Sequence, residues 1–132
     1  MKGIFEDQNG IPIQLEVDSS TLAEIIDDLA NGSIPFFRLE STGGEYLQCA
    51  GKENTFTVEL RKIGSNDFKH YVIGRPKQSK VWKMIYCSVG PIRVLEHEVF
   101  SKDDVKLLCS DFNANSNLSD VFIKRNVTKL YK

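Results

Sequence analysis

The chain has 132 residues, of which 41% are hydrophobic and 27% are charged. This length suits one globular domain with a single core, and the composition differs from that of disordered chains. No apolar run reaches the roughly 18 residues that span a bilayer, and acids stand near the start, where a secretory signal needs an apolar stretch. We therefore expect one cytoplasmic domain over residues 1–132, with no membrane partner.

Charge is unevenly distributed along the chain, although the net charge is only −1. Residues 1–60 hold eleven acids and three bases, a net charge of −8, whereas residues 61–132 hold seven acids and fourteen bases, a net charge of +7. If this division survives folding, the domain has one acidic face and one basic face.

The first predicted elements are a strand over residues 11–17 and a helix over residues 19–31. The helix is predicted because Leu22, Ile25, Ile26 and Leu29 recur at helical spacing and form one apolar stripe. Thr21 followed by Glu24 fits a capping box, and Gly32 fits the left-handed residue that ends a helix.

Strand-like segments separated by short turns follow this helix. They cover residues 34–40, 45–50, 55–62, 68–74, 81–87 and 92–99, with a short terminal strand over 120–125. The turns are too short for crossover helices, so consecutive strands are expected to be antiparallel neighbours.

A second amphipathic helix is predicted over residues 101–112. Ser101 and Asp104 form its cap, and its apolar stripe consists of Val105, Leu108, Cys109 and Phe112. The predicted fold is α+β: an antiparallel meander of about five to seven strands with an N-terminal and a C-terminal amphipathic helix packed on it.

The hairpin of residues 45–50 and 55–62 has a predicted four-residue loop at 51–54. This register pairs Leu47 with Val58, and strand alternation then gives a core face of Leu47, Cys49, Phe56, Val58 and Leu60. The opposite face carries Tyr46, Gln48, Thr57, Glu59 and Arg61. That face is a binding surface or an ordinary solvated sheet face, and the alternation alone favours the solvated face.

Motifs that carry chemistry are absent from the sequence. It lacks a nucleophile elbow, a phosphate-binding loop, a dinucleotide fingerprint and a zinc-protease motif. His97 stands between Glu96 and Glu98, but on a strand it would point away from both. The three cysteines, Cys49, Cys87 and Cys109, never form a CxxC pair and are expected to be buried free thiols. We expect neither an enzyme nor a cofactor or metal.

Basic and aromatic residues alternate between positions 69 and 93. Lysines and arginines could hold a phosphate backbone while the aromatic rings stack on bases. However, the chain is slightly acidic overall, and Trp82, Met84 and Tyr86 share one strand face, which favours packing over display. A small nucleic-acid-binding module is therefore the alternative function. The basic residues are Lys69, Arg75, Lys77, Lys80, Lys83 and Arg93, and the aromatic residues are Tyr71, Trp82 and Tyr86.

Residues 35–75, about a third of the chain, resemble a run in immunity proteins of bacterial polymorphic and contact-dependent growth inhibition toxins. In those proteins a Tyr-aliphatic-Gln strand is followed by a Val-Glu-aromatic-Arg strand and a His-Tyr strand. Leu60 stands where an aromatic residue is often found. The matching residues are Tyr46, Gln48, Val58, Glu59, Arg61, His70 and Tyr71.

The resemblance implies a cytoplasmic antitoxin that binds its cognate toxin and blocks it. Many such toxins are nucleases with basic active sites, so acidic side chains of the inhibitor would steer association. An adaptor domain whose partner is not a toxin is a third interpretation. The residues expected to bind the partner are Glu24, Asp27, Asp28, Glu45, Tyr46, Gln48 and Glu59.

Overall fold

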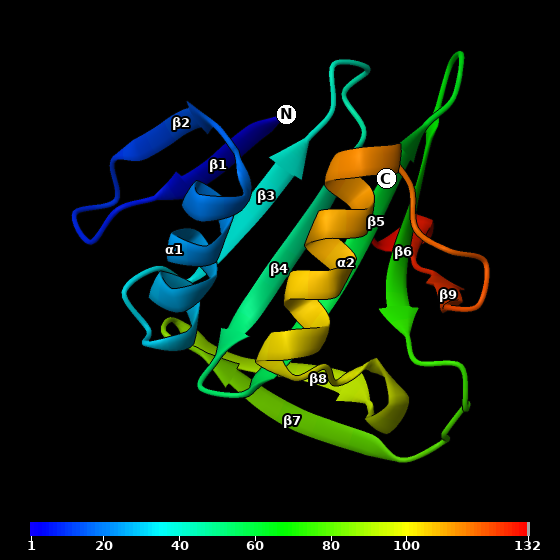
Figure 1. Cartoon of the computed structure of the whole chain (residues 1–132). Helices are drawn as coiled ribbons and strands as arrows, with labels where there is room; N and C mark the ends of the chain where they lie inside the picture. The colour runs from blue at the N-terminus through cyan, green and yellow to red at the C-terminus, as the bar shows by residue number, and fades with distance from the viewer. Residues whose placement is uncertain (132) are drawn as a thin grey trace.

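The structure is a computed structural model that describes residues 1–131. Within these residues the chain forms strands, two α-helices and two short 3-10 helices, η1 and η2 (Figure 1). In chain order they are β1 (Lys2–Glu6), β2 (Pro12–Glu16), α1 (Ser19–Ala30), β3 (Phe36–Glu40), β4 (Tyr46–Lys52), β5 (Thr55–Ile63), β6 (Phe68–Gly74), β7 (Trp82–Cys87), β8 (Gly90–Leu95), η1 (Glu96–Glu98), α2 (Lys102–Asn115), β9 (Ile123–Asn126) and η2 (Thr128–Tyr131).

Seven strands form one antiparallel sheet in the order β2-β1-β3-β4-β5-β6-β9. Both helices pack on the same face of this sheet, and β7 and β8 form a separate hairpin across one end of it (Figure 1). The prediction of an α+β fold with an antiparallel sheet is confirmed. Neither α-helix of the described chain is long and apolar enough to cross a membrane.

The predicted position of the helices at the two ends of the chain is wrong. Strands β1 and β2 precede α1, and β9 follows α2; β2 and β9 correspond to the strands predicted over residues 11–17 and 120–125, and β1 was not predicted. Gly3 interrupts the short apolar pattern of β1. That glycine lets the chain pack closely, since a Cβ there would lie 2.6 Å from Cγ2 of Val17.

The predicted meander also breaks after β6. The chain leaves the main sheet at Gly74, and β9 takes the edge position beside β6, with Val72 opposite Arg125. Gly74 lies against His97, where a Cβ would come within 2.4 Å of the imidazole ring. The long segment 75–81, which includes Pro76, then carries the chain to the separate hairpin.

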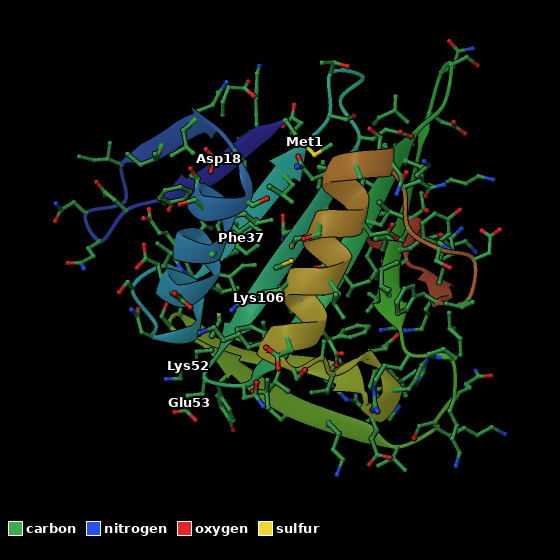
Figure 2. The ribbon with its side chains drawn as sticks, in the orientation of Figure 1. Met1, Asp18, Phe37, Lys52, Glu53 and Lys106 are labelled. Carbon is green, nitrogen blue, oxygen red and sulfur yellow. The ribbon has the colours of Figure 1, made fainter. Side chains whose placement is uncertain are left out.

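The core lies between the two helices and the sheet, and both predicted helical stripes are buried in it. Phe37 of β3, labelled beside α1 in Figure 2, is fully buried in this core. The Sγ atoms of Cys49 and Cys109 lie 3.8 Å apart in this layer. The contact with Cys109 and the burial raise the pKa of the Cys49 thiol. All three cysteines are buried and free, as predicted.

One of the two predicted helix caps is confirmed. Ser101 accepts the backbone N–H of Asp104, and the Asp104 carboxylate accepts the N–H of Ser101. The predicted Thr21 cap is wrong, because Asp18 accepts the N–H of Thr21 at 2.8 Å and the helix begins earlier. Gly32, with a φ of +82°, follows the end of α1 as expected.

The register of the β4–β5 hairpin differs from the prediction by two residues. Leu47 lies opposite Leu60, and Cys49 lies opposite Val58. Pairing continues to Lys52 opposite Thr55, so only Glu53 and Asn54 form the loop. Gly51 allows the two strands to approach closely here, since a Cβ on it would come within 2.2 Å of the Thr55 carbonyl oxygen. A shift of two residues keeps every side chain on its predicted face.

Replacing Leu47 with alanine should lower the free energy of unfolding by about 2–4 kcal/mol, because it removes buried methyl groups and leaves a cavity. Leu47 has no exposed surface. Urea unfolding measures the change. Val89→Ala, at an exposed position, is the control and should stay within about 0.5 kcal/mol of the parent. A Leu47→Ala loss as small as the control's would contradict this core.

Candidate functional site

Polar side chains gather on the sheet face that points away from both helices. They stand side by side because β4 pairs with β3 and β5, and β5 pairs with β6. The prediction that the polar side chains of the β4–β5 hairpin share one face of the sheet is therefore confirmed. We call this group the open-face cluster, and its members are Arg38, Tyr46, Gln48, Glu59, Arg61 and His70.

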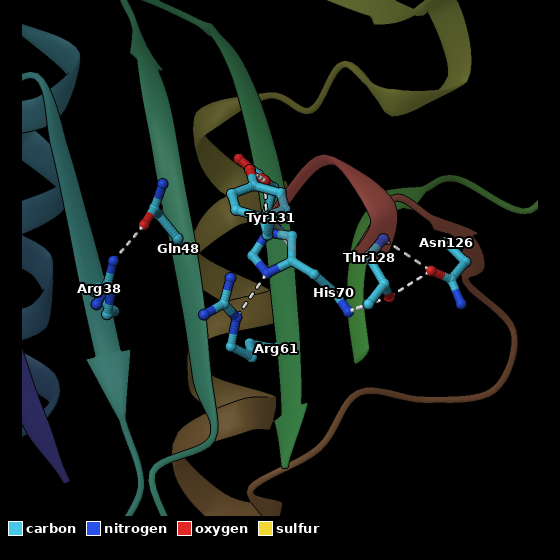
Figure 3. A network of polar contacts seen from close by, with 8 residues as sticks. Arg38, Gln48, Arg61, His70, Asn126, Thr128 and Tyr131 are labelled. Atoms are coloured by element: carbon cyan, nitrogen blue, oxygen red, sulfur yellow. Dashed lines mark hydrogen bonds and ion pairs between the residues drawn. The ribbon is translucent and has the colours of Figure 1, made fainter. Parts of the chain in front are cut away.

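His70 lies at the centre of a hydrogen-bond network (Figure 3). The Arg61 Nε–H donates to Nδ1 of His70 at 3.1 Å, and Nε2 of His70 lies 2.7 Å from Oε1 of Glu59. Since Nδ1 accepts from Arg61, the ring carries its proton on Nε2 and donates it to Glu59.

The C-terminal turn closes over this network. The Tyr131 ring lies 4.2 Å from the His70 ring, and its hydroxyl donates to Glu59 at 2.8 Å. Burial raises the pKa of Glu59, but the hydrogen bonds from His70 and Tyr131 outweigh it and hold that pKa below its usual value. Burial and the nearby carboxylate raise the pKa of Tyr131 to about 12.

The chemistry available to the two histidines is limited by these contacts. His70 is 1% exposed and both of its ring nitrogens are bonded, so neither reaches a molecule outside the fold. His97 lies in the 3-10 helix η1 and not on the predicted strand. It is buried, and its Nδ1 accepts the backbone N–H of Ser79 at 3.2 Å. In residues 1–131, no three metal-ligating side chains converge.

Two arginines flank the buried Tyr46 ring on the open face. The Arg38 guanidinium lies 4.0 Å from the ring centre and donates to Gln48 at 3.1 Å, and that of Arg61 lies 5.2 Å away. These cation–π contacts and the hydrogen bond hold the Arg38, Arg61 and Tyr46 side chains in place. Tyr46 and Gln48, two of the predicted partner-binding residues, thus stand in the same cluster as Glu59.

The structure separates the acidic residues that the sequence grouped together. Glu24, Asp27 and Asp28 are exposed on α1, on the opposite side of the sheet from Glu59. A hydrogen bond and ion pair with Lys102 lowers the pKa of Asp27. Glu45 pairs with Lys62 at 3.4 Å. A partner bound to α1 would therefore not contact Glu59 directly.

The β7–β8 hairpin displays aromatic side chains that the sequence analysis assigned to packing. Trp82, Met84 and Tyr86 are 46%, 51% and 55% exposed. Strand alternation correctly predicted that these three side chains share one face of the hairpin. The face that is buried is the opposite one, which carries Ile85, Cys87 and Val94. We call Trp82, Met84, Tyr86 and Arg93 the hairpin face.

The hairpin is basic as well as aromatic. The hairpin holds two bases, Lys83 and Arg93, the segment 75–81 that leads into it holds three more, and residues 75–95 contain no acid. The Arg93 guanidinium stacks on Trp82 at 4.4 Å from the ring centre, which holds both side chains in a defined position. The hairpin face therefore combines rigid apolar surface with positive charge.

A buried ion pair anchors the hairpin to the main sheet. Glu98 has no exposed surface, and both of its carboxylate oxygens accept from Arg125 of β9, at 2.8 and 2.9 Å. Glu98 also accepts the backbone N–H of Leu95, the last residue of β8. Arg125 in turn lies 5.5 Å from the centre of the Trp82 ring. No motif in the sequence indicated this pair.

A scan against protein-family models and a search of curated proteins each gave no match to this chain. The function is therefore inferred from the two surfaces described above.

Replacing Glu59 with glutamine should lower stability at neutral pH by about 1–2 kcal/mol, because a charged acceptor becomes a neutral one. Since the folded pKa of Glu59 lies below its usual value, its contribution is present above that value and is lost as the pH falls through the folded pKa. The difference from the parent should shrink between pH 7 and pH 3 in urea unfolding. The exposed Glu24→Gln is the control, and a difference for Glu59→Gln that is constant with pH would contradict the network.

Replacing Arg125 with methionine should cost about 3–5 kcal/mol, because the Glu98 carboxylate is left buried without its partner. Lys124→Met, on the same strand, should change stability by less than about 1 kcal/mol. Chemical unfolding of the two variants measures this contrast. Equal, small losses in both would mean that the ion pair does not anchor the hairpin.

Proposed function

We propose that this domain binds another protein, that it is an immunity protein that neutralises a cognate bacterial toxin, and that the toxin is a nuclease. The hairpin face is the observation that carries the proposal of protein binding. Trp, Tyr, Met and Arg are the residue types enriched in protein interfaces, and Trp, Tyr and Arg dominate their hot spots. Here three apolar side chains of these types are about half exposed and lie outside the core.

The immunity function rests on the resemblance of residues 35–75. Five of its seven matching residues, Tyr46, Gln48, Glu59, Arg61 and His70, stand together in the open-face cluster. The hydrogen bonds of His70 with Arg61 and Glu59, and the stacking of Arg61 on Tyr46, indicate that this face of the sheet is rigid. A rigid surface loses little side-chain entropy on binding, which favours the tight complex that an inhibitor needs.

The charge distribution adds a second proposed contact region. The strands of the acidic half lie at the β2 end of the sheet, and those of the basic half lie at the β9 end. Glu24 and Asp28 on α1 would steer a basic toxin, whereas the hairpin face would supply buried contact area. Charges at the rim of an interface mainly raise the association rate and make it salt-dependent.

The test uses the toxin region encoded beside this chain, expressed and purified as the binding partner. Trp82→Ala combined with Tyr86→Ala should weaken its affinity by at least about 100-fold, the loss expected for two hot-spot residues. Glu24→Lys combined with Asp28→Lys should slow association and reduce its salt dependence. The exposed Leu130→Ala is the matched control and should bind like the parent. An intact affinity in every variant would contradict the proposed surfaces, and no binding to the adjacent toxin would contradict the immunity function.

Nucleic-acid binding is the second candidate, because five bases, Trp82 and Tyr86 lie within 75–95 without an acid. A basic strand with exposed rings can hold a phosphate backbone and stack on bases. Retention on single-stranded DNA or RNA at physiological salt, lost in the Trp82 and Tyr86 double variant, would favour this candidate over the immunity function.

A further inference from the structure

A cavity of about 590 Å³ lies between α2 and the segment that follows β6. It is separate from the hairpin face and from the open-face cluster. Its walls come from three parts of the chain, namely residues 75–77, helix α2 and Phe122 just before β9. This volume lies within the range of small-molecule sites in proteins.

The floor and one wall of the cavity are apolar. Phe100 and Leu108 are buried at its base, and the ring of Phe122 packs edge-on against that of Phe100. Leu107 of α2 also lines the cavity, and it is 71% exposed. An exposed leucine beside two phenylalanines leaves apolar surface that a ligand would remove from water.

The acids and bases around the cavity differ in their hydrogen-bond partners. Asp104 caps α2 through the N–H of Ser101, and Asp111 accepts the side-chain N–H of Asn115 at 2.8 Å. On the opposite wall, the Arg75 guanidinium donates to the Glu96 carbonyl, and neither Arg75 nor Lys77 has a carboxylate within 4 Å among residues 1–131. Arg75 and Lys77 are therefore cations without an ionic partner on this wall, whereas each acid on α2 already accepts one N–H of its own helix or cap.

We propose that this cavity binds a small apolar anion, with its aromatic or aliphatic body on Phe100, Leu107 and Phe122 and its carboxylate at Arg75 and Lys77. The apolar body supplies most of the binding free energy, and the two cations set the orientation and the sign of charge. The site therefore has positive side chains on one wall and the two acids of α2 on the opposite wall. A ligand with a positive end in place of the carboxylate would meet Arg75 and Lys77 unfavourably.

The probes are 2-naphthoate and 2-naphthylmethylamine, which share an apolar body and differ in charge. Isothermal titration of the full chain should give saturable 2-naphthoate binding that is at least about tenfold tighter than binding of the amine. Leu107→Glu should weaken naphthoate binding by about tenfold or more, and Lys77→Gln by about three- to tenfold. Both positions are exposed, so the variants should keep the parent's unfolding midpoint.

Matched controls carry the same changes away from the cavity. Val89→Glu and Lys69→Gln, both at exposed positions, should bind naphthoate like the parent. Asp111→Asn should leave the affinity unchanged or raise it. The proposal is overturned if naphthoate does not bind saturably, if the amine binds more tightly, or if Leu107→Glu and Lys77→Gln bind like the controls. This result is independent of whether the chain binds a toxin.

Discussion

The buried carboxylate of Glu98 determines how the second half of this chain is arranged. It accepts two hydrogen bonds from Arg125 and a third from the backbone of Leu95, so it joins the end of the β7–β8 hairpin to the last strand of the sheet. A fully buried charge is tolerated only when it is paired and hydrogen-bonded, and here it is both. The Glu98 side chain thus links the hairpin to β9, in addition to the pairing of β9 with β6 and the burial of Ile85 and Val94.

Two consequences follow from this anchor. Because β9 is fixed beside β6, the turn after it places Thr128 and Tyr131 against His70, and this closes the open-face network. Because the hairpin is fixed through its end, its inner residues Ile85 and Val94 are buried while Trp82 stays outside, between Arg93 and Arg125. The same interaction thus stabilises the polar face and displays the aromatic one.

Local sequence signals predicted most of the elements but not their long-range arrangement. The stripe of Leu22, Ile25, Ile26 and Leu29 is a property of one helix, and its burial was predicted correctly. Strand alternation likewise placed Tyr46, Gln48 and Glu59 on one face, even though the register was wrong by two residues. The pairing of β6 with β9, the Glu98–Arg125 ion pair and the exposure of Trp82 depend on residues far apart in the chain. Alternation identifies the two faces of a hairpin, but which face is buried depends on where the hairpin docks.

We propose that the hairpin face is the surface that contacts the partner. Hydrogen–deuterium exchange of the domain, free and mixed with the cognate toxin that the proposed function assigns to it, tests this proposal without any substitution. We expect slower backbone exchange on binding across residues 82–95, where β7 and β8 carry Trp82 and Arg93. Protection confined to β1, β2 and α1, with unchanged exchange in the hairpin, would contradict it.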